Sequence, residues 1–149
     1  ITPDLTPDEA EEWMAASEAH GLDRVFLVAP SSTDERLAST VAACRGWVYA
    51  TSVMGVTGTR AQTSSAAPEL VARVKAVNSE IPVGVGLGVS NSDQAAEVGS
   101  FADGVIVGSA LVRALVEAEE QGETAHVGID RMRTIVDDLV SGVRRARLQ

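Results

Sequence analysis

The feature of this sequence that most constrains its fold is an apolar strand, a short loop and a helix that recur along the chain. Apolar segments at residues 24–30, 46–53, 81–87 and 103–108 are each followed by a segment of helical character. Strands that are apolar on both faces and alternate with helices form parallel sheets, in which all strand-to-helix loops lie on one side. We therefore predict an α/β fold in one domain, with its functional site at the carboxyl ends of the strands.

The chain opens on "ITPDL", residues 1–5, which is typical of the end of a strand, so we expect further strands upstream. Five strands in all could form an open flavodoxin-like sheet, or part of an eight-stranded barrel that needs about 200 residues or more. The length of the chain by itself favours the open sheet.

Capping patterns predict where the helices begin and end. Residues 6–9 (TPDE) and 32–35 (STDE) each carry a hydroxyl residue three positions before a glutamate, which predicts helices capped by Thr6 and Ser32. The first helix should stop at His20 and Gly21. Later helices are predicted at Pro68–Val77 and from Asp130 onward.

Composition and charge exclude several classes of protein. The 149 residues are 45% hydrophobic, which is enough for a sizeable core, and the net charge of −9 argues against a nucleic-acid or anionic-membrane binder. The single cysteine, Cys44, forms no internal disulfide, is expected to be a buried helix residue, and fits a reducing cytoplasm. No metal-ligand spacing is present, so we expect no metal site.

Glycines are concentrated at the ends of the last two predicted strands. Gly84, Gly86 and Gly88 alternate along one strand, and glycine inside a strand indicates that a neighbouring chain or a ligand approaches the backbone closely. The dinucleotide pattern G-x-G-x-x-G fails because Val89 and Asn91 stand where glycine is required. The glycines therefore belong to a different kind of binding site, or to no binding site at all.

Two strand ends, "GLGVS" and "GSA", each deliver bare backbone N–H groups to the start of a helix. Such groups can hold a phosphate without lysine or arginine, and in eight-stranded barrels a phosphate frequently sits on the loops after the last two strands. The alternative is that these glycines only permit tight strand-to-helix turns. The spacing leaves both interpretations open.

The segments "VMGVTG", "PVGVGLGVS" and "ADGVIVGSALV", in this order, resemble the last three strand ends of the tryptophan synthase alpha subunit family. "ITPDL" and "RVFLVAPSSTDERL" resemble its fourth and fifth strands. The resemblance implies a (β/α)8 TIM barrel of which this chain supplies about the last five βα units. It also implies cleavage of indole-3-glycerol phosphate to indole and glyceraldehyde 3-phosphate, with indole passed to a beta subunit that carries pyridoxal phosphate.

The resemblance assigns the substrate phosphate to Gly58, Gly88, Gly108 and Ser109, in agreement with the expectation from bare backbone. It also places Thr57 in a long loop, residues 54–67, that closes over the ligand. We therefore expect this loop to act as a lid.

The same resemblance places Tyr49 beside the catalytic carboxylates and makes Leu27, Leu87 and Ile106 the wall of the indole pocket. Leu87 stands where enteric members of the family carry phenylalanine, which alters the shape of the pocket. Val53 stands where they carry arginine, which changes the contacts of the long loop.

The catalytic glutamate and aspartate of the family have no counterpart in this chain. We expect Asp4 to be structural, Asp103 to lie on the face opposite the site, and His20 and His126, the latter in a polar loop, to be non-catalytic. Three hypotheses follow: part of an indole-3-glycerol phosphate lyase that needs no cofactor of its own, a non-catalytic half-barrel that binds a phosphorylated ligand or a partner, or another phosphate-binding barrel isomerase.

Overall fold

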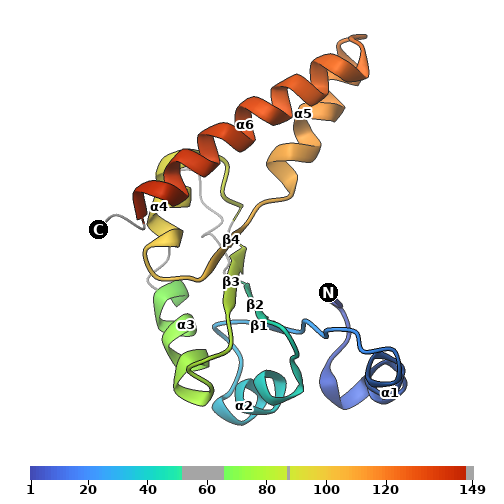
Figure 1. Cartoon of the computed structure of the whole chain (residues 1–149), viewed down its shortest axis with the longest axis vertical. Coiled ribbons are helices and arrows are strands. Elements are labelled where there is room, and N and C mark those ends of the chain that lie inside the picture. The colour runs from blue at the N-terminus through green and yellow to red at the C-terminus, as the bar shows by residue number, and fades with distance from the viewer. Residues whose placement is uncertain (52–65, 87, 147–149) are drawn as a thin grey trace.

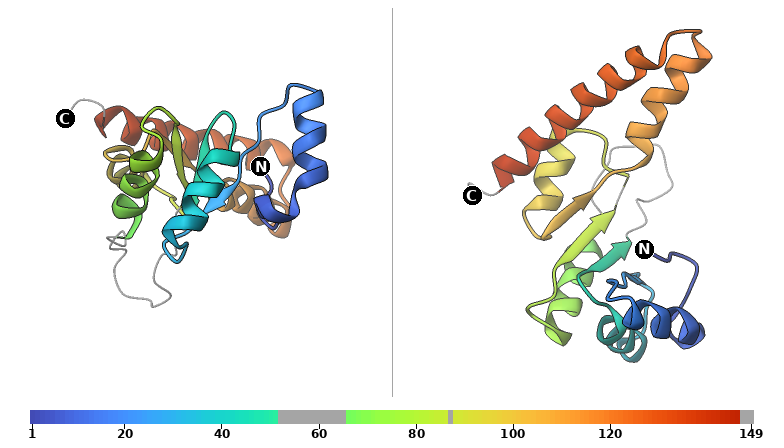
Figure 2. Two further views of the ribbon diagram at one scale, coloured as in Figure 1. Left: turned by 90° about the horizontal axis from the view of Figure 1, so that it is seen from below. Right: turned by 45° about the vertical axis from the view of Figure 1, so that its right-hand side comes forward.

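Four short parallel strands form one sheet at the centre of the molecule (Figure 1). The computed structural model describes residues 1–51, 66–86 and 88–146. The strands are β1 (Leu27–Val28), β2 (Val48–Thr51), β3 (Val83–Gly86) and β4 (Gly104–Ile106), and all point the same way (Figure 2). The α/β class and the parallel sheet predicted from the alternation of strands and helices are confirmed.

The strands are ordered in the sheet as they are in the chain, β1-β2-β3-β4. In a flavodoxin-like sheet, the order in which successive strands are added reverses at a switch point. In a barrel, each new strand is added beside the last one. Among the described strands there is no reversal, so the order fits a segment of a barrel.

Helices connect the strands and extend beyond them at both ends. The helical elements are the 3₁₀ helix η1 (Pro7–Glu9), α1 (Glu11–Ala19), α2 (Asp34–Ala43), α3 (Ala66–Val77), α4 (Ser92–Gly99), α5 (Ser109–Glu120) and α6 (Ala125–Ala146). The α2, α3 and α4 helices are the crossovers between successive strands, and α6 runs from α5 back to α4 (Figure 1).

The core lies between the sheet and the crossover helices. Val48, Ala50, Val83 and Val85 are at most 1% exposed, and they pack in one cluster with apolar residues of α2, α3 and α4. Side chains alternate along a strand, so the intervening residues lie on the opposite face of the sheet. That opposite face carries the candidate site.

The strand expected at residues 1–5 does not form. Pro3 has no N–H group to donate, and residues 3–4 make a turn instead. One backbone hydrogen bond, from Thr2 N to Val25 O at 3.2 Å, ties this segment to the residues that precede β1.

Two helix starts differ from the predicted caps. The Ser32 hydroxyl accepts a hydrogen bond from Ala29 N at 3.1 Å and closes the turn after β1, so Thr33 caps α2 by accepting from Arg36 N. The Thr6 hydroxyl donates to the Glu9 carboxylate at 2.8 Å, but the chain there forms η1, and α1 begins only at Glu11.

Several helix bounds can be compared directly with the expectations. The α3 helix ends at Val77 as predicted, but it begins at Ala66, two residues before Pro68. The α1 helix ends at the predicted place: His20 is its C-cap, and Gly21 follows in the left-handed conformation with a φ of 63°. The α6 helix begins at Ala125 rather than at Asp130, so His126 lies in a helix and not in a loop. Cys44 caps the end of α2 and is only partly buried, and that burial raises the pKa of its thiol.

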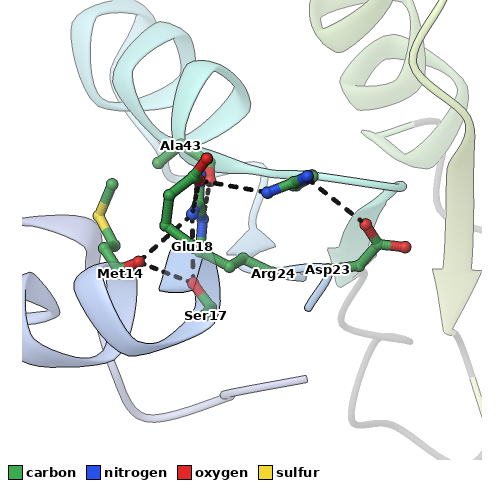
Figure 3. A network of polar contacts seen from close by, with 7 residues as sticks. Met14, Ser17, Glu18, Asp23, Arg24 and Ala43 are labelled. Carbon is green, nitrogen blue, oxygen red and sulfur yellow. Dashed lines mark hydrogen bonds and ion pairs between the residues drawn. The ribbon is translucent and has the colours of Figure 1, made fainter. Parts of the chain in front are cut away.

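The Arg24 side chain fastens α1 to the end of α2 (Figure 3). This side chain is only 12% exposed and donates to Ala43 O at 3.2 Å, to the buried Ser17 hydroxyl at 3.1 Å and to Glu18 at 3.1 Å. A buried acceptor that loses its donor costs more free energy than an exposed one, because water cannot replace the bond. Arg24 is therefore a structural centre of the amino-terminal part of the chain.

Replacing Arg24 with alanine should lower the free energy of unfolding by about 2–3 kcal/mol, because several part-buried acceptors lose one donor. Urea denaturation measures this change. Arg45→Ala is the matched control: Arg45 is 43% exposed and pairs with Glu18 and Asp23, so its loss should cost less than about 1 kcal/mol. Equal losses in the two variants would contradict the role given to Arg24.

Asp103 joins β3, β4 and α3 at the amino ends of the strands. Its carboxylate accepts from Val83 N and from Lys75 Nζ, both at 2.8 Å. The hydrogen bond from Lys75 lowers the pKa of Asp103, burial opposes this, and the Val83 N–H lowers it further. Asp103 thus lies on the face opposite the carboxyl ends, as the sequence predicted.

The Asp103 contact should make stability depend on pH. The pKa of Asp103 in the folded protein lies below the unfolded value of about 3.9, so its contribution is complete above that value and is lost as the pH falls through the folded pKa. Asp103→Asn should therefore lower the free energy of unfolding at pH 7, and the difference from wild type should shrink in acid. In a Lys75→Met background the difference at pH 7 should be smaller, because Lys75 supplies the largest part of the Asp103 contact.

Candidate functional site

A cleft of about 860 Å³ lies beside the carboxyl ends of β3 and β4, on the face of the sheet away from the crossover helices. Strand and loop residues form one side of the cleft, and α5 and α6 form the other. The lining residues from the sheet and its loops are Tyr49, Gly86, Gly88, Val89, Ser90, Ile106 and Gly108.

Two aromatic side chains of the β2 segment lie over the glycines of β3. The Trp47 and Tyr49 rings are stacked with centroids 6.0 Å apart. A Cβ atom on Gly84 would come within 2.8 Å of the Trp47 ring, and one on Gly86 would run into the Tyr49 hydroxyl. The close approach that these strand glycines indicated is therefore made by neighbouring side chains, and it fixes Tyr49 in the cleft.

Gly88 and Gly108 have a different role from the strand glycines. A Cβ atom at either position would meet nothing within 4 Å among the residues that the structure describes, so no described group requires the missing side chain. Gly88 has a φ of 67°, which favours glycine on conformational grounds, whereas the φ of Gly108, −127°, lies outside the left-handed region. A backbone left bare without a steric need is typical of a place where a ligand approaches.

Several backbone amides beside these two glycines have no hydrogen-bond partner in the described part of the chain. Leu111 N and Val112 N both donate to Gly108 O, which leaves Ser109 N and Ala110 N as the open first amides of α5. A helix N-terminus with open amides attracts anions, because the amides and the helix dipole both favour negative charge. The cleft can therefore hold an anionic group without a cation.

Five of the predicted site residues lie together in this cleft. These are Tyr49, Gly88, Ile106, Gly108 and Ser109.

The other predicted site residues lie elsewhere or outside the described part. Leu27 lines a separate cavity of about 120 Å³ near the amino-terminal segment, although it pairs in register with Tyr49 and so lies on the same face of the sheet. Thr57, Gly58 and Leu87, like Val53, lie outside the described residues.

The wall formed by α5 and α6 was not predicted from the sequence. It consists of Ser109, Ala110, Arg113, Ala114 and Glu117 from α5 and Arg131, Thr134 and Ile135 from α6. The spacing of the α5 residues, at i, i+1, i+4, i+5 and i+8, is that of one helix face, so the α5 part could have been found once Ser109 was assigned to the site.

Charge in the cleft is close to balanced. Arg131 is held by Glu123 at 2.7 Å, while Arg113 is exposed and pairs with no acidic residue that the structure describes. Glu117 is the carboxylate among the lining residues, and it lies on exposed helix surface. No pair of carboxylates lines the described part of the cleft.

Residues 1–51, 66–86 and 88–146 contain neither a cluster of metal ligands nor a helix that could span a membrane. In these segments no group of three or more histidine, cysteine or acidic side chains is placed to hold a metal ion. None of the helices there has the length and apolar character that crossing a membrane requires.

Comparison with known proteins identifies the family. The model of the tryptophan synthase alpha chain family matches residues 1–141. The chain belongs to the tryptophan synthase alpha chain family. Among curated proteins, the tryptophan synthase alpha chain of Mycobacterium ulcerans is 63% identical over 147 residues, which are 99% of this chain and 51% of the relative.

Solved structures give the same result at the level of the fold. A tryptophan synthase structure from Mycobacterium tuberculosis matches with a TM-score of 0.81 at 62% identity, over 97% of this chain and 51% of the matched one. A structure of the tryptophan synthase a2b2 complex from Pyrococcus furiosus matches with a TM-score of 0.77 at 32% identity, over 92% of this chain and 53% of the other.

These matches define how much of the family's fold the chain contains. The chain spans about half the length of the curated relatives it matches. The fold is accordingly part of the (β/α)8 barrel of the tryptophan synthase alpha chain family, as the resemblance implied, and the open flavodoxin-like alternative is wrong.

Proposed function

We propose that this chain provides the phosphate-binding part of an indole-3-glycerol phosphate lyase of tryptophan biosynthesis. The observation that carries the proposal is the meeting of Gly88 with Gly108 and Ser109 in one cleft that also holds Tyr49. Open amides and a helix N-terminus suit the phosphate of the substrate, and a neighbouring aromatic ring and Ile106 suit its indole. Gly58 would complete the phosphate site, and Leu27 and Leu87 the indole wall.

The reaction breaks the bond between indole C3 and the glycerol phosphate side chain. A proton must be added at C3 and another removed from a glycerol hydroxyl, so a positioned acid and base are required. In this proposal they come from the part of the family's length that the chain does not span. The described residues anchor the phosphate, and Tyr49 lies against the reacting end, with Thr57 closing over the substrate.

The proposal also concerns cofactor, partner and location. The cleavage needs no cofactor in this chain, and the pyridoxal phosphate of the second half-reaction belongs to the partner beta subunit. The partner is proposed because the matched Pyrococcus furiosus structure is an a2b2 complex. A cytoplasmic enzyme fits the single cysteine.

The second candidate is a half-barrel that binds a phosphorylated ligand without catalysis. It is favoured by one observation, the lack of a carboxylate pair in the described part of the cleft. Membership of the alpha chain family argues against the barrel isomerases as a third candidate.

An activity measurement separates the two candidates. The 149-residue chain by itself should release no indole from indole-3-glycerol phosphate, because the proposal places the acid and the base outside this chain. General acid/base catalysis contributes about 10²–10⁴-fold to the rate. Mixing it with a fragment that covers the first half of the Mycobacterium ulcerans relative should restore indole release. A mixture that binds glycerol phosphate but makes no indole would favour the non-catalytic binding module instead.

The Gly108 position offers a clean test of the phosphate site. Gly108→Val should disturb the fold less than a substitution at Gly88, because its φ of −127° lies outside the left-handed region and no described atom lies within 4 Å of a Cβ atom there. It should weaken glycerol phosphate binding at least about tenfold in calorimetry, because the new methyl groups obstruct two or more charge-assisted hydrogen bonds.

Gly88→Val is a less selective variant, because a branched side chain at φ 67° strains the backbone whatever binds there. It should both destabilise the protein and weaken binding. Unchanged affinity in folded Gly108→Val would exclude this cleft as the phosphate site.

A further inference from the structure

The long helix α6 contacts both of the helices that begin beside the proposed phosphate site. It packs against α5, whose first residues are Ser109 and Ala110, and against α4, which follows the loop that contains Gly88 (Figure 1). The Gly88 side and the Ser109 side of the proposed phosphate site are thus connected through one helix, α6.

A glycine lies at each of the two crossings. A Cβ atom on Gly128 would come within 3.0 Å of Leu115 on α5, and one on Gly142 would run into the backbone carbonyl of Ser92, the first residue of α4. The two glycines are 14 positions apart, a separation of about 21 Å along a helix. The α6 helix therefore approaches each neighbour as closely as its backbone allows.

The α4 crossing is also fixed by a hydrogen bond to the backbone. The Asp138 carboxylate on α6 accepts from Ser92 N at 2.8 Å. An exposed ion pair between Arg145 and Asp93, at 2.7 Å, adds to this contact.

The first turn of α4 in turn holds the loop that precedes it. Gln94 accepts hydrogen bonds from Ser90 N at 2.9 Å and from the Ser90 hydroxyl at 3.2 Å, and Asn91 caps α4 by accepting from Gln94 N. A displacement of the α4 N-terminus would therefore be transmitted to Val89 and Gly88.

We propose that Asp138 and Gly142 are positioning residues for the substrate phosphate: through Ser92 they set the distance between the Gly88 loop and the start of α5. The proposal rests on the proposed function, since it names residues that act on the same site. Neither residue touches the phosphate. Their effect is on the geometry of the backbone amides that do.

The test compares Asp138→Ala with Asp138→Asn in the intact protein that contains these residues. Alanine removes the acceptor for Ser92 N, whereas asparagine keeps an acceptor and removes only the charge. Asp138→Ala should raise the Kd for glycerol phosphate and the KM for indole-3-glycerol phosphate by about three- to tenfold, the factor that one net hydrogen bond represents, with kcat unchanged. Asp138→Asn should stay within about twofold of wild type.

The neighbouring Asp137 is the matched control, because it is exposed and has no side-chain partner among the described residues. Asp137→Ala makes the same change of charge and should leave both constants unaltered. If Asp138→Ala does not fold, Ser92→Pro removes the donor instead, at a first helical position that accepts proline, and it should give the same rise in KM.

The remaining outcomes overturn the proposal in distinguishable ways. Tighter binding in both Asp138 variants would mean that the carboxylate acts only by repelling phosphate. Equal affinity in Asp138→Ala and Asp137→Ala, or a loss of kcat at unchanged KM, would mean that the contact does not position the site. Failure of the wild-type protein to bind glycerol phosphate would instead refute the proposed function.

Discussion

The constraint on which the rest of the structure depends is a parallel sheet whose strands follow chain order. This order places the connections after β3 and β4 next to each other, so residues 88 and 108 line one cleft although 20 positions separate them. It leaves the amino ends of the same strands at the opposite edge, where Asp103 and Lys75 join them. Contacts that hold the fold and contacts that face the cleft are thereby kept apart.

Glycine performs two separate tasks in this sheet, and only the structure distinguishes them. On β3 the absence of side chains accommodates Trp47 and Tyr49 from the neighbouring strand. After β3 and β4, no described residue comes within 4 Å of where the glycines would carry a side chain, which leaves that space open to a ligand. In the sequence the three alternating glycines look equivalent, because the aromatic residues that explain two of them lie more than 30 positions away.

Much of the fold could be predicted because the apolar strands and their order are local properties of the sequence. The strand at residues 1–5 could not, since Pro3 and a turn outweigh its apolar residues. Of two adjacent hydroxyl residues, only the structure shows that Ser32 closes a turn and Thr33 caps the helix. The resemblance to a family supplied the glycines of the cleft, and the helical spacing from Ser109 could have supplied the α5 side of its wall. The α6 side depends on how that helix packs against α5, which no local pattern encodes.

The open amides at the start of α5 have a consequence for how the sequence can vary. A hydrogen bond donated by the main chain is present whatever side chain the residue carries, so substitutions at residues such as Ala110 leave the donor in place. What must be preserved is the path of the backbone and the absence of bulk at Gly108. A helix N-terminus with open amides therefore tolerates substitution of its side chains better than a change in the path of its backbone. Its amides favour anions even in a chain with a net charge of −9.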